Sequence, residues 1–160
     1  MQDNLTPTAF RQYTHNTQEG YIPVTGGRIW YKVVGKNLQG VPLLVLHGGP
    51  GASHDYLEPI EGIARDRPVI FYDQLGCGNS DKPEDTALWT LERYVDELHQ
   101  LRQALELKEV HILGQSWGAS LAAEYVLRHP QGIASLVLSE ALLSTSRWIE
   151  DQKTQIAQLP

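Results

Sequence analysis

The residues best suited to chemistry in this sequence are Gly114-Gln-Ser-Trp-Gly118, in which a serine has a glycine two positions away on each side. They lie between an apolar run, residues 110–113, and a helical pattern that begins at Trp117. A serine on such a strand-to-helix turn is held in a strained conformation above the sheet edge, and the flanking glycines relieve the crowding. The pattern predicts that Ser116 is a nucleophile for acyl transfer, and an ordinary glycine-rich turn is the alternative.

A second glycine-rich segment, His47-Gly-Gly-Pro-Gly51, directly follows another apolar run, residues 43–46. Its glycines let backbone N–H groups approach a ligand, and two such donors stabilise the negative oxygen that forms during acyl transfer. We expect Gly49 and Trp117 to be these donors of an oxyanion hole. A phosphate-binding turn or a plain tight loop is the alternative, although the lysine of a phosphate loop is missing. The supporting loop consists of His47, Gly48 and Gly51, with His47 as a brace rather than a base.

A third segment, Asp73-Gln-Leu-Gly-Cys-Gly-Asn-Ser80, follows the apolar run 69–72. We interpret it as a turn that shapes the floor of a pocket, with Asp73 accepting hydrogen bonds from backbone amides. Cys77 has no cationic neighbours in the sequence that would lower its pKa. We therefore expect an inert thiol.

These segments need strands to position them. Short apolar runs without alternation are typical of parallel strands covered on both faces. Two β-rich runs around Gly26-Gly27 indicate a hairpin, and Pro23 in the first of them favours an edge strand. Residues 1–20 lack periodicity and are expected to form an N-terminal arm. The predicted strands are 21–24, 28–34, 43–46, 69–72, 110–113 and 135–138.

Helical patterns separate the later strands. Apolar residues recur at three- and four-residue spacing over residues 90–107, where Thr90 is placed to cap a helix. A second helix over residues 117–129 is halted by Pro130. Strand followed by helix, repeated, predicts an α/β fold with a mostly parallel sheet, right-handed crossovers and helices on both faces.

Composition excludes several function classes. The formal net charge of -6 and the pI of about 5.4 leave no basic surface for nucleic acid or an anionic membrane. A single cysteine excludes an intrachain disulfide, and no apolar stretch approaches the roughly 20 residues of a membrane span. The first ten residues do not resemble a signal peptide, so we expect a cytoplasmic protein.

The three glycine-containing segments, in this order and spacing, resemble the proline iminopeptidases and their relatives within the α/β-hydrolases. The resemblance runs from about Tyr21 to the C-terminus and includes residues 146–151, which are similar to the start of that family's helical cap. It implies that residues 21–143 form the N-terminal part of the hydrolase core and residues 144–160 the start of the cap. It also implies serine hydrolysis that releases an N-terminal residue, often proline, from small peptides or amides, without metal or cofactor.

A triad base is missing from this pattern. The chain order on this fold is serine, then an acid, then histidine, yet the only histidine after Ser116 is His129. His129 ends the predicted helix, roughly 18 Å away at 1.5 Å per residue, which is too far for a base. The resemblance implies an acid and a histidine after the cap. We therefore expect a partial chain, inactive alone, that is completed by further residues or by a complementary C-terminal chain.

Three alternatives stay open from the sequence. Glu140 follows the last predicted strand, where we expect it to cap or line the pocket, with the role of triad acid as the alternative. An esterase or lactonase would carry the same serine turn. A non-catalytic binding remnant would keep the pocket without turnover.

Overall fold

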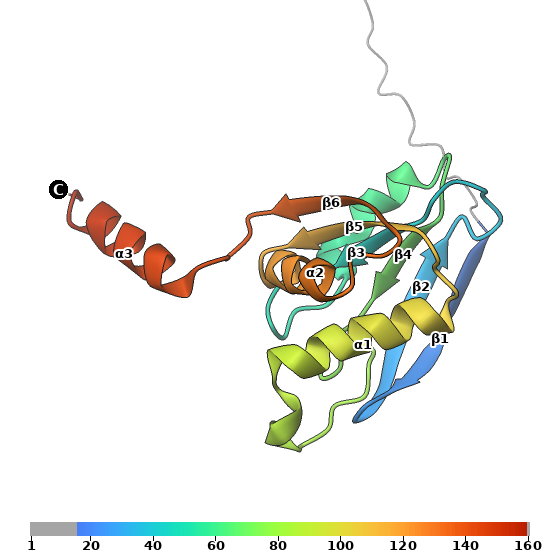
Figure 1. Ribbon diagram of the computed structural model, residues 1–160, viewed down its shortest axis with the longest axis horizontal. Coiled ribbons are helices and arrows are strands. Elements are labelled where there is room, and N and C mark those ends of the chain that lie inside the picture. The colour runs from blue at the N-terminus through green and yellow to red at the C-terminus, as the bar shows by residue number, and fades with distance from the viewer. Residues whose placement is uncertain (1–15, 160) are drawn as a thin grey trace, which may run out of the picture.

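A six-stranded mixed sheet forms the centre of the computed structural model, which describes residues 16–159 (Figure 1). The strand order is β1-β2-β4-β3-β5-β6, with β4, β3, β5 and β6 parallel and the β1–β2 hairpin antiparallel at one edge. The predicted α/β fold with a mostly parallel sheet is confirmed. The strands are β1 (Thr17–Val24), β2 (Gly27–Val34), β3 (Leu43–Leu46), β4 (Val69–Tyr72), β5 (Val110–Gln115) and β6 (Ile133–Ser139).

The β1–β2 hairpin is longer than the two β-rich runs that predict it. Strand β1 begins at Thr17, which pairs with Val34, so the predicted arm of residues 1–20 extends too far. The last residues of that arm are ordered into a strand because β2 offers them a pairing partner, which no local periodicity reports. Residues 1–15 lie outside the described residues. Pro23 lies on an edge strand, as expected.

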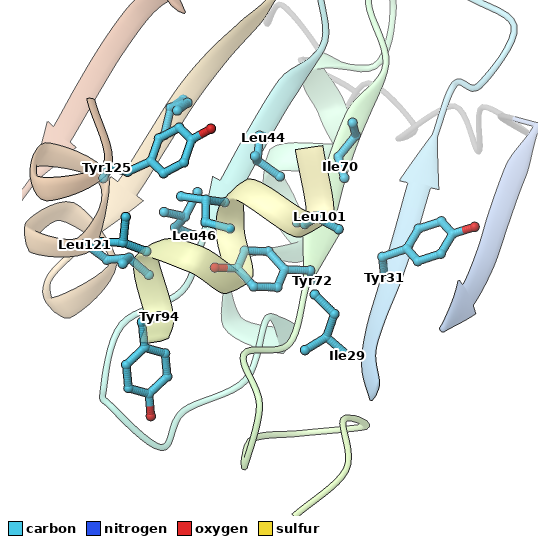
Figure 2. Close-up of a cluster of buried hydrophobic side chains, with 14 of the residues drawn as sticks. Ile29, Tyr31, Leu44, Leu46, Ile70, Tyr72, Tyr94, Leu101, Leu121 and Tyr125 are labelled. Carbon is cyan, nitrogen blue, oxygen red and sulfur yellow. The ribbon is translucent and has the colours of Figure 1, made fainter. Parts of the chain in front are cut away.

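Helices α1 (Leu91–Ala104) and α2 (Trp117–Arg128) cover one face of the sheet (Figure 1). The Thr90 side chain accepts a hydrogen bond from the backbone N–H of Arg93 and so begins α1 as predicted. Apolar side chains from both helices meet those of β2, β3, β4 and β5 in one buried cluster (Figure 2). Its labelled members include Leu44, Leu46, Ile70, Tyr72, Leu101, Leu121 and Tyr125.

The opposite face packs against a 3₁₀ segment, η1 (Asp55–Ile63). Leu57 and Ala64 contact Val45 and Phe71 there in a second, smaller cluster. A further short 3₁₀ segment, η2 (Thr86–Leu88), precedes α1. The central strands β3 and β4 are therefore buried along their whole length, as the apolar runs predict.

Strand β6 differs from that expectation. Helix α2 packs on one of its faces, but Val137 is 47% exposed and Leu138 is 38% exposed. On the other face, a hollow of about 520 Å³ lies between β5, β6 and the end of η1. The prediction that this strand is covered on both faces is wrong for the described residues, since no helix among them packs on that side as η1 packs on β3 and β4.

Helix α3 (Thr145–Ile156) projects away from the sheet at the end of β6 (Figure 1). The Ser144 side chain caps it by accepting a hydrogen bond from the N–H of Arg147. Leu143 and Trp148 are more than half exposed. The assignment of this helix to a cap stays a prediction. Within residues 16–159, no helix combines the length and the apolar character needed to cross a bilayer.

Candidate active site

Ser116 occupies the turn between β5 and α2 in a conformation that few side-chain-bearing residues adopt. Its backbone angles are φ 54° and ψ −119°. Such a conformation costs on the order of 1–3 kcal/mol and persists where the surrounding structure enforces it. One enforcing contact is the hydrogen bond from the N–H of Ser116 to the carbonyl oxygen of Ser139, at 2.8 Å. The strained strand-to-helix turn predicted from the sequence is therefore present.

The two glycines that flank Ser116 allow the turn to pack this tightly. A Cβ at Gly114 would overlap the backbone carbonyl of Gly118. A Cβ at Gly118 would overlap the carbonyl oxygens of Leu46 and His47, at the end of β3. Any side chain at these positions would push α2 away from the neighbouring strand, so the G-x-S-x-G spacing follows from packing.

The pairing of β3 with β5 brings the two predicted oxyanion-hole residues together. Leu46 pairs with Gly114 in the parallel ladder, and Gly49 and Trp117 each follow three residues later. Both line a cavity of about 530 Å³ together with Ser116. The remaining lining residues are mainly apolar and come from the glycine-rich loop, the start of α1, α2, and the segment from the end of β6 to the first residue of α3: Pro50, Leu91, Ser120, Ala123, Glu124, Leu127, Leu142, Leu143 and Thr145.

The backbone N–H groups around this cavity differ in their hydrogen bonds. The N–H of Gly48 donates to the Tyr56 hydroxyl at 2.6 Å and is therefore occupied. Within residues 16–159, the N–H of Gly49 has no backbone acceptor, and the N–H of Trp117, at the first position of α2, belongs to the helical turn whose N–H groups have no partner inside the helix. Trp117 is also the first residue of α2, where the helix dipole favours negative charge. Gly49 and Trp117 therefore stay the predicted donors of an oxyanion hole, and both line the cavity that Ser116 lines.

His47 braces the loop that carries Gly49. Its Nε2 accepts a hydrogen bond from the backbone N–H of Gln74 at 3.0 Å, so the ring proton lies on Nδ1, which donates to the carbonyl oxygen of Gly48 at 2.8 Å. Burial lowers the pKa of His47 and outweighs the Gly48 contact, which opposes the shift. With both ring nitrogens occupied, a neutral His47 has no site for the serine proton.

The other histidines of residues 16–159 lie away from the cavity. His54 is buried, and its Nδ1 lies 2.9 Å from Asp73 Oδ1. His129 ends α2 and stacks on His99, with the ring centroids 4.3 Å apart. His111 lies near the start of β5, where its Nδ1 lies 2.7 Å from the Ser135 hydroxyl. No histidine among the described residues lines the cavity.

Asp73 organises the turn after β4, as predicted. Its Oδ1 accepts a hydrogen bond from the N–H of His54 at 2.9 Å, and its Oδ2 accepts one from the N–H of Asn79 at 2.8 Å. Cys77, in the same turn, is buried, and this burial raises the pKa of its thiol. Both results agree with a structural turn and an inert thiol.

Glu140 lies directly after β6 but does not line the cavity with Ser116. Its carboxylate accepts a hydrogen bond from Gln115 Nε2 at 3.0 Å, and Gln115 Oε1 accepts one from the Tyr56 hydroxyl at 2.7 Å. This chain of contacts reaches the N–H of Gly48 and so ties the serine turn to the glycine-rich loop. Sequence reasoning missed the roles of Tyr56 and Gln115, because nothing in the local pattern pairs residues so far apart in the chain.

Comparison with known proteins gives consistent matches. A proline iminopeptidase of Heyndrickxia coagulans is 54% identical over 142 residues, which cover 89% of this chain and 49% of the relative. One from Lactobacillus acidophilus is 47% identical over 146 residues, which cover 89% of this chain and 50% of the relative. The chain therefore spans about half the length of the curated relatives that it matches.

Solved structures and a family profile agree with these relatives. The crystal structure of a proline iminopeptidase from Mycobacterium smegmatis superposes with a TM-score of 0.83 at 40% identity, covering 89% of this chain and 50% of that one. Residues 41–160 match the profile of the alpha/beta hydrolase fold. These residues contain the strained serine turn, the glycine-rich loop and the parallel strands that align them. The chain belongs to the alpha/beta hydrolase fold family.

Proposed function

We propose that this chain carries the nucleophile and the oxyanion hole of a serine hydrolase that releases an N-terminal residue, proline or similar, from small peptides or amides. The observation that carries the proposal is the shared cavity, which is lined by the strained Ser116 together with Gly49 and Trp117. The similarity to proline iminopeptidases supports the choice of substrate class.

In the proposed reaction, the Ser116 oxygen bonds to the carbonyl carbon of the substrate while a general base takes the hydroxyl proton. The negative oxygen that forms accepts hydrogen bonds from Gly49 and Trp117, and each such donor contributes roughly 3–4 kcal/mol to the transition state. The carbon–nitrogen bond then breaks, the departing amine takes the proton, and water releases the acid from the serine ester.

The general base of this proposal is a histidine contributed from outside residues 16–159. The five histidines within that range have partners elsewhere or lie at the far end of α2. We propose that further residues of the polypeptide, or a complementary C-terminal chain, supply this histidine and its acid. No metal, cofactor, nucleic acid or membrane takes part in the proposed reaction.

The nucleophile is tested by Ser116→Ala in the complete enzyme. We expect turnover of proline arylamides to fall by about 10³-fold or more while the thermal unfolding midpoint changes little, because the reaction loses its covalent step. A fluorophosphonate probe should label the wild type at Ser116, as read by mass spectrometry of peptides. Ser135→Ala, at a serine outside the cavity, is the matched control and should keep both labelling and turnover.

Labelling of another serine would overturn the assignment of the nucleophile. The substrate class is tested separately with proline arylamides, other amino-acid arylamides and short p-nitrophenyl esters. Preference for the esters would favour an esterase of the same fold. Substrate binding without turnover in the complete enzyme would indicate a binding protein.

A further inference from the structure

Gln74 lies in the turn after β4, and its side chain is completely buried. Its Oε1 accepts a hydrogen bond from the indole Nε1 of Trp117 at 2.9 Å. Its Nε2 donates to the carbonyl oxygen of His47 at 2.9 Å, and its backbone N–H donates to His47 Nε2. One amide group therefore contacts both the glycine-rich loop and the serine turn.

The orientation of this amide follows from the chemistry of its partners. An indole nitrogen is only a donor, and a backbone carbonyl oxygen is only an acceptor. Oxygen must therefore face Trp117 and nitrogen must face His47, and a flipped amide would lose both hydrogen bonds. A buried polar group with two well-made partners is costly to disrupt, so it fixes the positions of both.

The strand order of the sheet explains why Gln74, in the turn after β4, can contact both His47 and Trp117. Strand β3 lies between β4 and β5, so the turn after β4 reaches across the end of β3 to the start of α2. The Trp117 ring is also held by an edge-on contact with Tyr94, with the centroids 5.6 Å apart. Gln74 thus meets a side chain whose other surroundings are already fixed.

We infer that Gln74 is a positioning residue, which sets the spacing between the two backbone donors, Gly49 and Trp117, of the oxyanion hole. This inference rests on the proposed function. Donors of this kind act in the transition state, so a displacement of about 1 Å costs rate more than substrate binding.

The test is Gln74→Leu in the complete enzyme, compared with Gln74→Glu. The leucine variant removes both hydrogen bonds, whereas glutamate keeps an acceptor for Trp117 and loses the donor to His47. For Gln74→Leu we expect kcat to fall about 10-fold or more with KM within about twofold, and labelling of Ser116 by a fluorophosphonate to slow in parallel. The indole N–H resonance of Trp117 should move upfield in Gln74→Leu and move less in Gln74→Glu.

Gln100→Leu is the matched control, because Gln100 contacts Thr25 outside the site. It should change none of these readouts. If Gln74→Leu does not fold, Trp117→Phe removes the same hydrogen bond from the serine turn and is expected to lower kcat in the same way. An unchanged kcat in whichever of these variants folds would overturn the inference. Failure of the proposed function would appear separately, as turnover that survives Ser116→Ala.

Discussion

Gly49 contributes to the candidate site through its backbone, and its surroundings leave no room for a side chain. Its φ is 125°, a conformation that L residues rarely adopt. A Cβ at this position would lie 2.5 Å from the nitrogen of Gly51 and 2.9 Å from that of Ala52. Any larger residue must therefore move the loop, and with it the backbone N–H of Gly49.

Gly49→Val is expected to lower kcat of the complete enzyme by roughly 100-fold or more, while KM changes far less. The reason is that a displaced N–H no longer meets the oxygen that becomes negative in the transition state. Steady-state kinetics with a proline arylamide measure both constants. Gly62→Val is the matched control, since a Cβ at Gly62 meets nothing within 4 Å. A Gly49→Val enzyme with the wild-type kcat would remove this loop from the mechanism.

At the scale of single residues, the sequence predicts what local patterns encode. The strained turn at Ser116 could be predicted because its glycines and its flanking strand and helix are neighbours in the chain. The bridging role of Gln74 could not, because its partners His47 and Trp117 come from two other motifs. Such contacts depend on the register of the sheet, which a single sequence does not reveal.

Helix α1 docks on the turn after β4 through a buried acid, Glu97. Its side chain is 1% exposed, and its carboxylate accepts a hydrogen bond from the N–H of Leu75 at 3.2 Å. It also pairs with Arg93 one turn earlier. Burial nevertheless raises the pKa of Glu97 to about 7, because the loss of hydration outweighs the stabilisation of the charged form by these contacts.

This shift predicts a pH dependence of the free energy of unfolding. The pKa of Glu97 is raised from 4.5 to about 7, so between these values the folded state binds a proton that the unfolded state has lost. The contribution of Glu97 to the free energy of unfolding is therefore greatest below pH 4.5 and is lost as the pH rises through 7. Because glutamine does not titrate, Glu97→Gln should remove the part of the pH-dependent fall in unfolding free energy that comes from Glu97.

Urea unfolding of the wild type and of Glu97→Gln, followed by circular dichroism from pH 5 to pH 8, tests this prediction. The difference in unfolding free energy between the two proteins should change steadily across that range. Glu109→Gln, which replaces an exposed acid, is the control, and its unfolding free energy should change with pH in parallel with that of the wild type. A constant difference for Glu97→Gln would show that the acid is charged throughout.

At the scale of elements, apolar runs and helix caps predict most of the structure. The parallel strands and both core helices form where their patterns indicate, and Thr90 caps α1. The patterns do not predict the start of β1, which depends on pairing with β2. They also do not predict the exposure of β6, because an apolar run reports what a strand can bury and not what covers it.

Strand β6 forms one edge of the whole sheet, and apolar side chains lie on it. Its partner is β5, and its outer edge presents backbone N–H and C=O groups that no other strand of the described residues pairs. Val137 and Leu138 are exposed on the same strand. An apolar edge of this kind is a template for pairing with another chain.

Residues 1–160 expressed alone are therefore expected to self-associate as their concentration rises. Light scattering across a dilution series measures the mass. Val137→Lys should lower the extent of association, because a charged side chain on an edge strand disfavours pairing. Leu127→Lys is the matched control, since Leu127 is 78% exposed on α2 and lies off the edge. A monomer at all concentrations would contradict the prediction.

The pairing of β3 with β5 also bears on how the protein folds. The two candidate donors follow the paired residues Leu46 and Gly114, and the whole of β4 and α1 lies between these strands in the chain. Closing so long a loop is entropically costly, and folds with high contact order are slow to form. A shift of one residue in the register of β3 against β5 would move the two candidate donors out of alignment. We therefore expect the two candidate donors to be aligned only once this long-range pairing has formed, so that the return of turnover during refolding of the complete enzyme would report the pairing of β3 with β5.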